Sequence, residues 1–199
     1  MLKSYYNKGQ IEAGCDEAGR GCLAGPVFAA AVILPPDFQH PLLDDSKKLS
    51  TKQRNELRPI IETRSRTFAV AWADQLEIDD INILNASILA MHRALEKLET
   101  PPAFILVDGN RFHPYKDIPY KTIVKGDGIY MNIAAASVLA KTYRDEFMTV
   151  IDRDYPEYGW AKNKGYPTLA HRQSIRKFGA TPHHRKSFTL LPPQYRLKF

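Results

Sequence analysis

Two adjacent carboxylates, Asp16 and Glu17, follow a short apolar segment, and a Gly-Arg-Gly turn at 19–21 comes directly after them. A second apolar run, 27–34, follows the turn. Burying an acidic pair beside an apolar strand is costly unless a cation or a hydrogen-bond donor compensates it. Backbone N–H groups of a glycine-rich turn can closely approach an anion or a sugar. We therefore predict a strand, a functional turn that could hold a metal ion against a phosphate, and a second strand, the alternative being an ordinary exposed acidic turn.

Two further carboxylates lie far along the chain. Asp108 ends the apolar segment 103–107, where ligand sites of α/β sheets tend to lie, although it could simply form a turn with Gly109. Asp127 precedes a long helical segment. If the fold brings all four acids together, divalent cations would relieve their repulsion, and oxygen ligands favour Mg²⁺ or Mn²⁺ over zinc. We expect Asp16 to be the central ligand, but neighbouring side chains on a strand point to opposite faces, so the strand must end or bulge for Glu17 to join it.

The surrounding pattern predicts the elements that position these acids. Ser50 and Gln53 have capping-box spacing, so a short helix begins at Ser50, and Pro59 should weaken or kink it near its end. Thr168 is expected to cap a helix that ends at Gly179. Further strands are expected at 67–73, 103–107 and 120–125, and further helices at 83–99 and 132–152. Five strands with helices between the later ones indicate one α/β domain.

Length and composition agree with a single domain. A chain of 199 residues with 44% hydrophobic residues can bury a substantial core. No apolar run is long enough to cross a bilayer, and the start of the chain lacks the apolar segment of a signal peptide, so we expect a cytoplasmic protein. Cys15 and Cys22 fit that reducing compartment as buried thiols, with a regulatory disulfide as the alternative.

Charge is distributed unevenly along the chain. The net charge is +6, yet the first 157 residues carry a net charge of −3, and no Asp or Glu follows Glu157. This basic C-terminal quarter indicates a surface that binds a polyanion, the alternative being a merely solvated basic surface. Four aromatic residues lie among the basic ones as candidate stacking groups: Tyr158, Trp160, Tyr166 and Phe178.

Six sequence blocks occur in the order found in type 2 ribonucleases H. They are DEAGRGCLAGPV at 16–27, DDSKKLS at 44–50, ILVDGN at 105–110, KGD at 125–127, AAASVLAKTYRDEFM at 134–148 and KGYPTLAHRQSIRKFG at 164–179. The chain resembles bacterial ribonuclease HII over residues 11–188. The resemblance implies a ribonuclease H-like fold with a mixed five-stranded sheet. It also implies a catalytic domain at 1–188, with a basic substrate-binding region at 158–188 and a tail at 189–199.

The same resemblance implies an activity and a set of site residues. The expected reaction is two-metal endonucleolytic cleavage of RNA in RNA/DNA hybrids, and 5′ to single ribonucleotides in duplex DNA, leaving 3′-hydroxyl and 5′-phosphate ends. The expected ligands of Mg²⁺ or Mn²⁺ are Asp16, Glu17, Asp108 and Asp127. The expected contacts to the ribose 2′-hydroxyl come from Gly19, Arg20 and Gly21, and Tyr166 would stack on the adjoining sugar. The expected phosphate contacts are Lys47, Lys48, Lys141 and Arg185.

Several alternatives stay open. The end of the chain, Gln194 to Phe199, resembles peptides bound by bacterial sliding clamps, or it is an uncommitted tail of an otherwise monomeric protein. Ribonuclease HIII carries an additional N-terminal domain, for which there is no room before Asp16. A hybrid-binding module without catalysis is opposed by the four carboxylates. A phosphatase acting on a small molecule is opposed by the basic C-terminal quarter.

Overall fold

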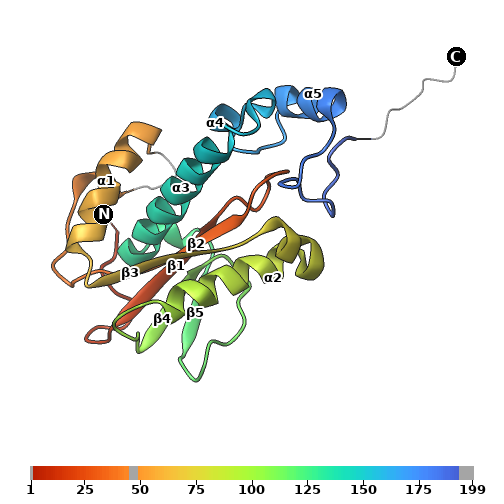
Figure 1. The fold of residues 1–199 in the computed structure, drawn as a ribbon. Helices are drawn as coiled ribbons and strands as arrows, with labels where there is room; N and C mark the ends of the chain where they lie inside the picture. The colour runs from red at the N-terminus through yellow and green to blue at the C-terminus, as the bar shows by residue number, and fades with distance from the viewer. Residues whose placement is uncertain (1, 45–48, 193–199) are drawn as a thin grey trace, which may run out of the picture.

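A mixed five-stranded sheet forms the centre of the computed structural model, which describes residues 2–44 and 49–192 (Figure 1). The strand order is β3-β2-β1-β4-β5. The strands are β1 (Glu12–Ala18), β2 (Val27–Ile33), β3 (Thr67–Ala73), β4 (Phe104–Asp108) and β5 (Tyr120–Ile123). β2 pairs antiparallel with β1 and β3, whereas β4 pairs parallel with β1 and β5. The predicted α/β fold with a mixed five-stranded sheet is confirmed.

Helices cover both faces of the sheet. They are α1 (Thr51–Arg64), α2 (Gln75–Glu96), α3 (Met131–Ile151), α4 (Trp160–Asn163) and α5 (Leu169–Phe178). One core lies between the sheet and α2, and a second lies between the sheet and the pair α1 and α3. α4 and α5 continue beyond one end of α3 (Figure 1).

Close packing of α3 on β1 fixes the centre of the molecule. Every residue of β2 is buried, as expected for an uninterrupted apolar strand with helices on both faces. A side chain at Gly14 of β1 would place its Cβ 2.2 Å from the backbone carbon of Asn132 in α3. Asn132 in turn donates from its side chain to the Glu12 carbonyl and accepts from the Leu34 N–H. Helix and sheet therefore meet backbone to backbone, directly beside the acidic end of β1.

One helix follows its predicted course and one departs from it. α1 begins at the predicted capping box of Ser50 and includes Pro59, which is exposed. α2 begins earlier than predicted, at Gln75, and is interrupted at Asn82, whose φ of 66° and ψ of 164° are not helical. The Asn82 side chain accepts hydrogen bonds from the N–H groups of Leu84 and Asn85, so it caps the second part of α2, which is the part the apolar spacing predicted.

Two further expectations concern the chain as a whole. Over residues 2–44 and 49–192, no helix is long and apolar enough to cross a membrane. Cys15 and Cys22 are both buried with free thiols, in agreement with the predicted structural role.

Candidate active site

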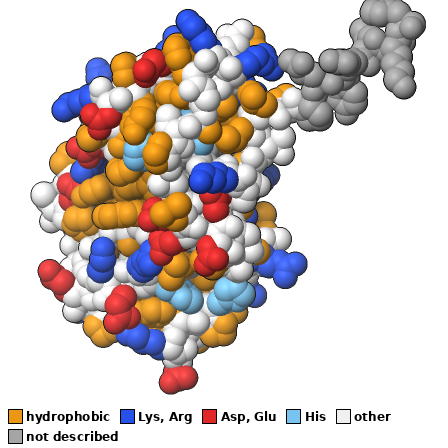
Figure 2. Space-filling model, turned by 45° about the vertical axis from the view of Figure 1, so that its right-hand side comes forward, with side chains coloured by type: hydrophobic (Ala, Val, Ile, Leu, Met, Phe, Trp, Pro, Cys, Tyr) orange, Lys and Arg blue, Asp and Glu red, His pale blue; other side chains and the backbone are white. Residues whose placement is uncertain are grey.

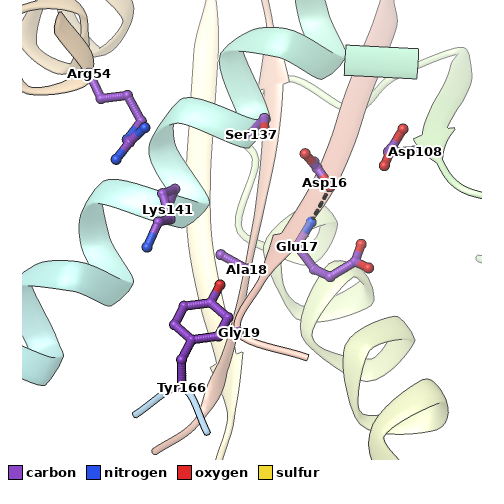
Figure 3. Close-up of a pocket in the computed structure, with 9 residues that line it drawn as sticks. All are labelled: Asp16, Glu17, Ala18, Gly19, Arg54, Asp108, Ser137, Lys141 and Tyr166. Carbon is purple, nitrogen blue, oxygen red and sulfur yellow. Dashed lines mark hydrogen bonds between the residues drawn. The ribbon is translucent and has the colours of Figure 1, made fainter. Parts of the chain in front are cut away.

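A pocket of about 330 Å³ lies at the end of β1 where the acidic pair is found (Figure 3). Its lining comes from β1 and the turn after it, α1, β4, α3 and the loop before α5. The lining residues are Asp16, Glu17, Ala18, Gly19, Arg54, Asp108, Ser137, Lys141 and Tyr166. In Figure 3 the three carboxylates lie on one side of the pocket, and the basic side chains and Tyr166 lie on the other. Segments more than a hundred residues apart in sequence thus meet in one polar site.

The side chains of Asp16 and Glu17 project from opposite faces of the sheet, because neighbouring residues on a strand alternate in direction. Asp16 lies beside Ser137 of α3, whereas Glu17 also lines a small neighbouring cavity against α2. β1 continues its regular pairing with β2 through Ala18, but its pairing with β4 ends at Cys15. Both carboxylates therefore lie beyond the last β1–β4 pair, and Asp108 at the end of β4 can reach the same pocket.

Burial disfavours the charged forms of Asp16 and Glu17. Asp16 is 5% exposed, and burial, together with the charges of Glu17 and Asp108, raises its pKa well above the usual value. Hydrogen bonds from Ser137 and from the Glu17 N–H, 2.7 Å from Oδ1, oppose this rise. Burial also raises the pKa of Glu17, against the effect of Arg20, whose guanidinium lies 3.1 Å from it. Oxygen donors in such surroundings suit a hard divalent cation.

The predicted four-carboxylate cluster is only partly assembled. Within the described ranges 2–44 and 49–192, no three His, Cys, Asp or Glu side chains converge closely enough to hold a metal ion. Glu17 is turned toward Arg20, and Asp108 accepts a hydrogen bond from the Gly126 N–H at 2.7 Å. Asp127 follows Gly126 but is 1% exposed and does not line the pocket. Its role as fourth ligand stays a prediction.

Arg185 holds the Gly19–Gly21 turn in place through hydrogen bonds to its backbone carbonyls. The guanidinium is fully buried and donates to the carbonyls of Gly19, Arg20 and Gly25 at 2.7, 2.9 and 2.9 Å. The prediction that Arg185 binds a phosphate is therefore wrong, because the side chain has no exposed surface. Sequence shows its charge, whereas only tertiary packing places it inside the molecule.

A second buried guanidinium, that of Arg144, was missed in the sequence. It donates to the carbonyls of Ala24, Pro26 and Lys164 at 3.0, 2.9 and 2.8 Å. Gly19 has a φ of +99°, and a Cβ there would lie 2.0 Å from the Arg144 Nε, so the position requires glycine. A signal was present: Arg144 continues the i, i+4 series of buried small residues along α3, where a charged residue is unusual.

The remaining predicted substrate residues have varied positions. Lys141 and Tyr166 line the pocket, and the Lys141 ammonium lies 5.6 Å from the centre of the Tyr166 ring. Gly21 belongs to the turn but not to the pocket lining. Lys47 and Lys48 lie outside the described residues. Arg54 and Ser137 also line the pocket and were missed, because an isolated arginine or serine within a helical pattern carries no signal of its own.

The basic C-terminal quarter contains fewer surface groups than its sequence indicates. Tyr158 and Trp160 are 5% and 0% exposed, so the prediction that they stack on substrate is wrong. Tyr166 and Phe178 are 39% and 50% exposed. The exposed basic side chains of 158–188 are Lys162, Arg176, Lys177 and Lys186. On the face drawn in Figure 2, acidic side chains gather near the middle, and most Lys and Arg side chains lie around them.

A mixed sheet with carboxylates at the ends of β1 and β4, flanked by helices, defines a ribonuclease H-like nuclease. The family model described as ribonuclease HII matches residues 13–191, and the chain belongs to this family. A ribonuclease HII of Parabacteroides distasonis is 61% identical over 199 residues, which cover both chains completely. Another, from Christiangramia forsetii, is 60% identical over 198 residues, again covering both chains. The chain is accordingly a metal-dependent endonuclease that degrades the RNA of RNA/DNA hybrids.

Solved structures agree with this fold. The ribonuclease H2 of Pyrococcus horikoshii superposes with a TM-score of 0.74 at 25% identity, covering 90% of this chain and 94% of that one. The structure of the PCNA:RNase HII complex from Archaeoglobus fulgidus contains a chain with the same TM-score at 23% identity, covering 94% of this chain and 98% of that one. Bst-RNase HIII, solved in complex with Mn²⁺, gives 0.67 at 19% identity, covering 85% and 63% of the two chains.

Proposed function

We propose that this endonuclease also cuts duplex DNA on the 5′ side of a single embedded ribonucleotide, leaving 3′-hydroxyl and 5′-phosphate ends. The observation that carries the proposal is the position of the Gly19–Gly21 turn. It directly follows the acidic strand, and Arg185 holds two of its carbonyls. A rigid backbone beside the carboxylates could recognise one ribose 2′-hydroxyl, which distinguishes RNA from DNA at a single nucleotide. Tyr166, across the pocket, would stack on the adjoining sugar.

Two divalent ions, Mg²⁺ or Mn²⁺, would be held by Asp16, Glu17, Asp108 and Asp127. The raised pKa of Asp16 supports this, because a cation would relieve the repulsion that burial and two neighbouring acids impose. Such ions supply an activated water and stabilise the leaving oxygen. Glu17 would exchange its contact with Arg20 for the metal, which would leave the Arg20 guanidinium available to the substrate backbone.

Phosphate contacts would come from the basic side of the pocket. Lys141 and Arg54 line it opposite the carboxylates, and Lys47 and Lys48 precede α1, the helix that carries Arg54. Contacts to phosphates position a duplex without reading its sequence. The enzyme is therefore expected to depend on the sugar at the cleaved position and not on the base.

The decisive experiment uses a DNA duplex containing one ribonucleotide, with Mg²⁺, Mn²⁺ or EDTA, and a long RNA/DNA hybrid in parallel. Cutting 5′ to the ribonucleotide should require metal, disappear in Asp16→Asn and weaken in Tyr166→Ala. Tyr5→Ala, which removes another exposed tyrosine ring outside the pocket lining, is the matched control. Cleavage of the long hybrid without any cleavage of the single-ribonucleotide duplex would refute the proposal.

We also propose that Gln194 to Phe199, which lie outside the described residues, bind a sliding clamp. The motif spacing supports this, as does the existence of a PCNA:RNase HII complex in Archaeoglobus fulgidus. Deleting residues 194–199 should abolish retention by the immobilised clamp of the source bacterium and leave cleavage of short duplexes unchanged. Equal retention of the full and shortened chains would contradict it.

A further inference from the structure

A buried pair of histidines lies behind the loop that carries Tyr166. His171 of α5 is 0% exposed and His184 is 1% exposed, and their Nε2 atoms are 3.2 Å apart. The indole Nε1 of Trp160 lies 2.9 Å from the same His171 Nε2. The pocket lining does not include either histidine, and the cleavage chemistry proposed above does not use them. Such a buried polar network needs a structural or functional explanation.

The donors around the pair determine where the protons are. The Trp160 N–H can only donate, so the His171 Nε2 accepts and its proton lies on Nδ1. That Nδ1 lies 2.9 Å from the Tyr166 carbonyl and donates to it. The Thr181 N–H donates to the His184 Nδ1 at 2.9 Å, so the His184 proton lies on Nε2 and is directed at His171. The two neutral imidazoles therefore have opposite tautomers, and every ring nitrogen has a partner.

The Tyr166 carbonyl is where this chain of hydrogen bonds ends. The preceding residue, Gly165, has a φ of +79°, and a Cβ there would lie 2.6 Å from the Ala24 carbonyl oxygen. Gly165 also accepts a hydrogen bond from the Leu23 N–H at 2.8 Å. The backbone that carries Tyr166 thus packs directly on the segment that follows the Gly19–Gly21 turn. A change in this backbone would move the ring relative to the turn.

Few contacts restrain the ring itself. It is 39% exposed, its hydroxyl contacts the buried Cys22 thiol, and the Lys141 ammonium, 5.6 Å from the ring centre, is paired with Asp145. The other restraint on the ring direction is the backbone of Tyr166. The hydrogen bond from His171 to the Tyr166 carbonyl can restrain that backbone.

We propose that His171, with its tautomer fixed by Trp160 and His184, is a positioning residue for Tyr166 and so determines how the enzyme binds the sugar next to the cleaved bond. This inference rests on the proposed stacking role of Tyr166. It assigns no chemistry to the histidines. They fix the orientation of the Tyr166 ring before substrate binds, which reduces the conformational entropy lost on binding.

Two substitutions at His171 distinguish a positioning role from a purely steric packing role. His171→Asn keeps an amide N–H near the Nδ1 position and can still donate to the Tyr166 carbonyl. His171→Gln places its amide near the Nε2 position and loses that donation. His171→Gln should raise KM for the single-ribonucleotide duplex roughly fivefold to tenfold, as expected for one lost buried hydrogen bond, with little change in kcat. His171→Asn should stay close to wild type.

The matched control is His92→Gln. His92 is a partly buried histidine on α2 whose Nε2 lies 3.1 Å from a backbone carbonyl, that of His113, and it does not line the pocket. This substitution should leave KM unchanged. Thermal unfolding of all three variants monitors folding, and an equal rise of KM in the Asn and Gln variants at position 171 would overturn the proposal.

A double-mutant cycle with Tyr166→Ala tests the route of the effect. In the Tyr166→Ala background, His171→Gln should raise KM no further, whereas additive effects would contradict positioning through Tyr166. If Tyr166→Ala raises KM but His171→Gln does not, positioning fails and the proposed stacking stands. If Tyr166→Ala itself leaves KM unchanged, the stacking role fails and positioning fails with it.

The proton arrangement can be measured on the unmodified enzyme. Long-range ¹H–¹⁵N spectra at pH 7 should show His171 protonated at Nδ1 and His184 at Nε2. Equal tautomers, or a doubly protonated ring at either position, would overturn the hydrogen-bond chain on which the inference depends.

Discussion

Asp16 is a buried acid whose surroundings favour its neutral form in the absence of a cation. Burial and two neighbouring carboxylates raise its pKa well above the usual value. A divalent ion that binds these oxygens binds the folded state and not the unfolded chain, so it should stabilise the fold by mass action. At the residue scale, the same side chain therefore weakens the metal-free fold and strengthens the metal-bound one.

Asp16→Asn should remove both the destabilisation of the metal-free fold and the stabilisation by metal. The amide has nearly the same shape but no charge, so the metal-free variant should unfold at an equal or higher temperature than wild type. Mn²⁺ should raise the unfolding temperature of wild type and leave that of the variant nearly unchanged. Cleavage should fall by about 1,000-fold or more, which corresponds to about 4 kcal/mol of transition-state stabilisation. Equal stabilisation of both proteins by Mn²⁺ would exclude Asp16 as a ligand.

Arg185→Lys should show that the buried guanidinium holds the Gly19–Gly21 turn. Lysine cannot reach three carbonyls at once, so at least two hydrogen bonds to buried acceptors are lost. We expect a loss of about 3 kcal/mol in the free energy of unfolding, measured by urea denaturation, and a raised KM. Arg176→Lys on the exposed side of α5 is the control and should change stability by less than about 0.5 kcal/mol.

At the scale of elements, local sequence predicts most of the fold. The capping signals of Ser50 and Thr168 and the apolar runs of the strands depend only on near neighbours, and the structure confirms them. The first part of α2 was missed although Asp74 and Glu77 form a capping box with the same spacing as Ser50 and Gln53. Asp79 lies there, and it binds the segment that follows Arg185. A contact of this kind leaves no periodic signal.

Asp79 allows this long-range contact to be tested. Its carboxylate accepts from the N–H groups of Lys186 and Ser187, both at 2.9 Å, and from the Ser187 hydroxyl at 2.6 Å. Asp79→Ala should lower the free energy of unfolding by about 1–2 kcal/mol. Asp80→Ala removes the next acid on the same helix, which is exposed, and should have a smaller effect. Equal losses in urea denaturation would show that the helix N-terminus alone, and not the contact, explains the effect.

At the scale of the whole molecule, the sequence indicated which carboxylates could gather better than it indicated which charges are buried. Asp16 and Asp108 lie near each other because β1 and β4 pair in parallel and each acid directly follows the last pair. The basic C-terminal quarter was interpreted as surface, yet Arg185 and the aromatic residues Tyr158 and Trp160 pack inside it. Charge along a chain does not reveal which charges are buried. His171 and His184 show the same difference, because both are buried.

These histidines should make the molecule sensitive to acid. Burial lowers the pKa values of His171, His183 and His184, that of His184 to about 4. No acid acts on the pKa of His171 or His184: Arg172 repels a charge on His171, His171 and His183 repel a charge on His184, and backbone hydrogen bonds oppose these effects. The unfolded chain binds a proton at His184 near pH 6.5, whereas the folded state binds it only near pH 4. Stability should therefore fall as the pH decreases through this window.

Asp16 acts in the opposite direction in the metal-free protein. Its raised folded pKa means that the folded state takes up a proton before the unfolded chain does, so this group adds stability as the pH falls. Urea denaturation between pH 7.5 and 4 should therefore be made in the Asp16→Asn background, where that contribution is absent. His184 alone should then cost about 3 kcal/mol across the window. His184→Gln should flatten the profile, whereas His92→Gln should not, and a profile that stays flat with all histidines present would mean that the buried pair is already protonated or exposed to water.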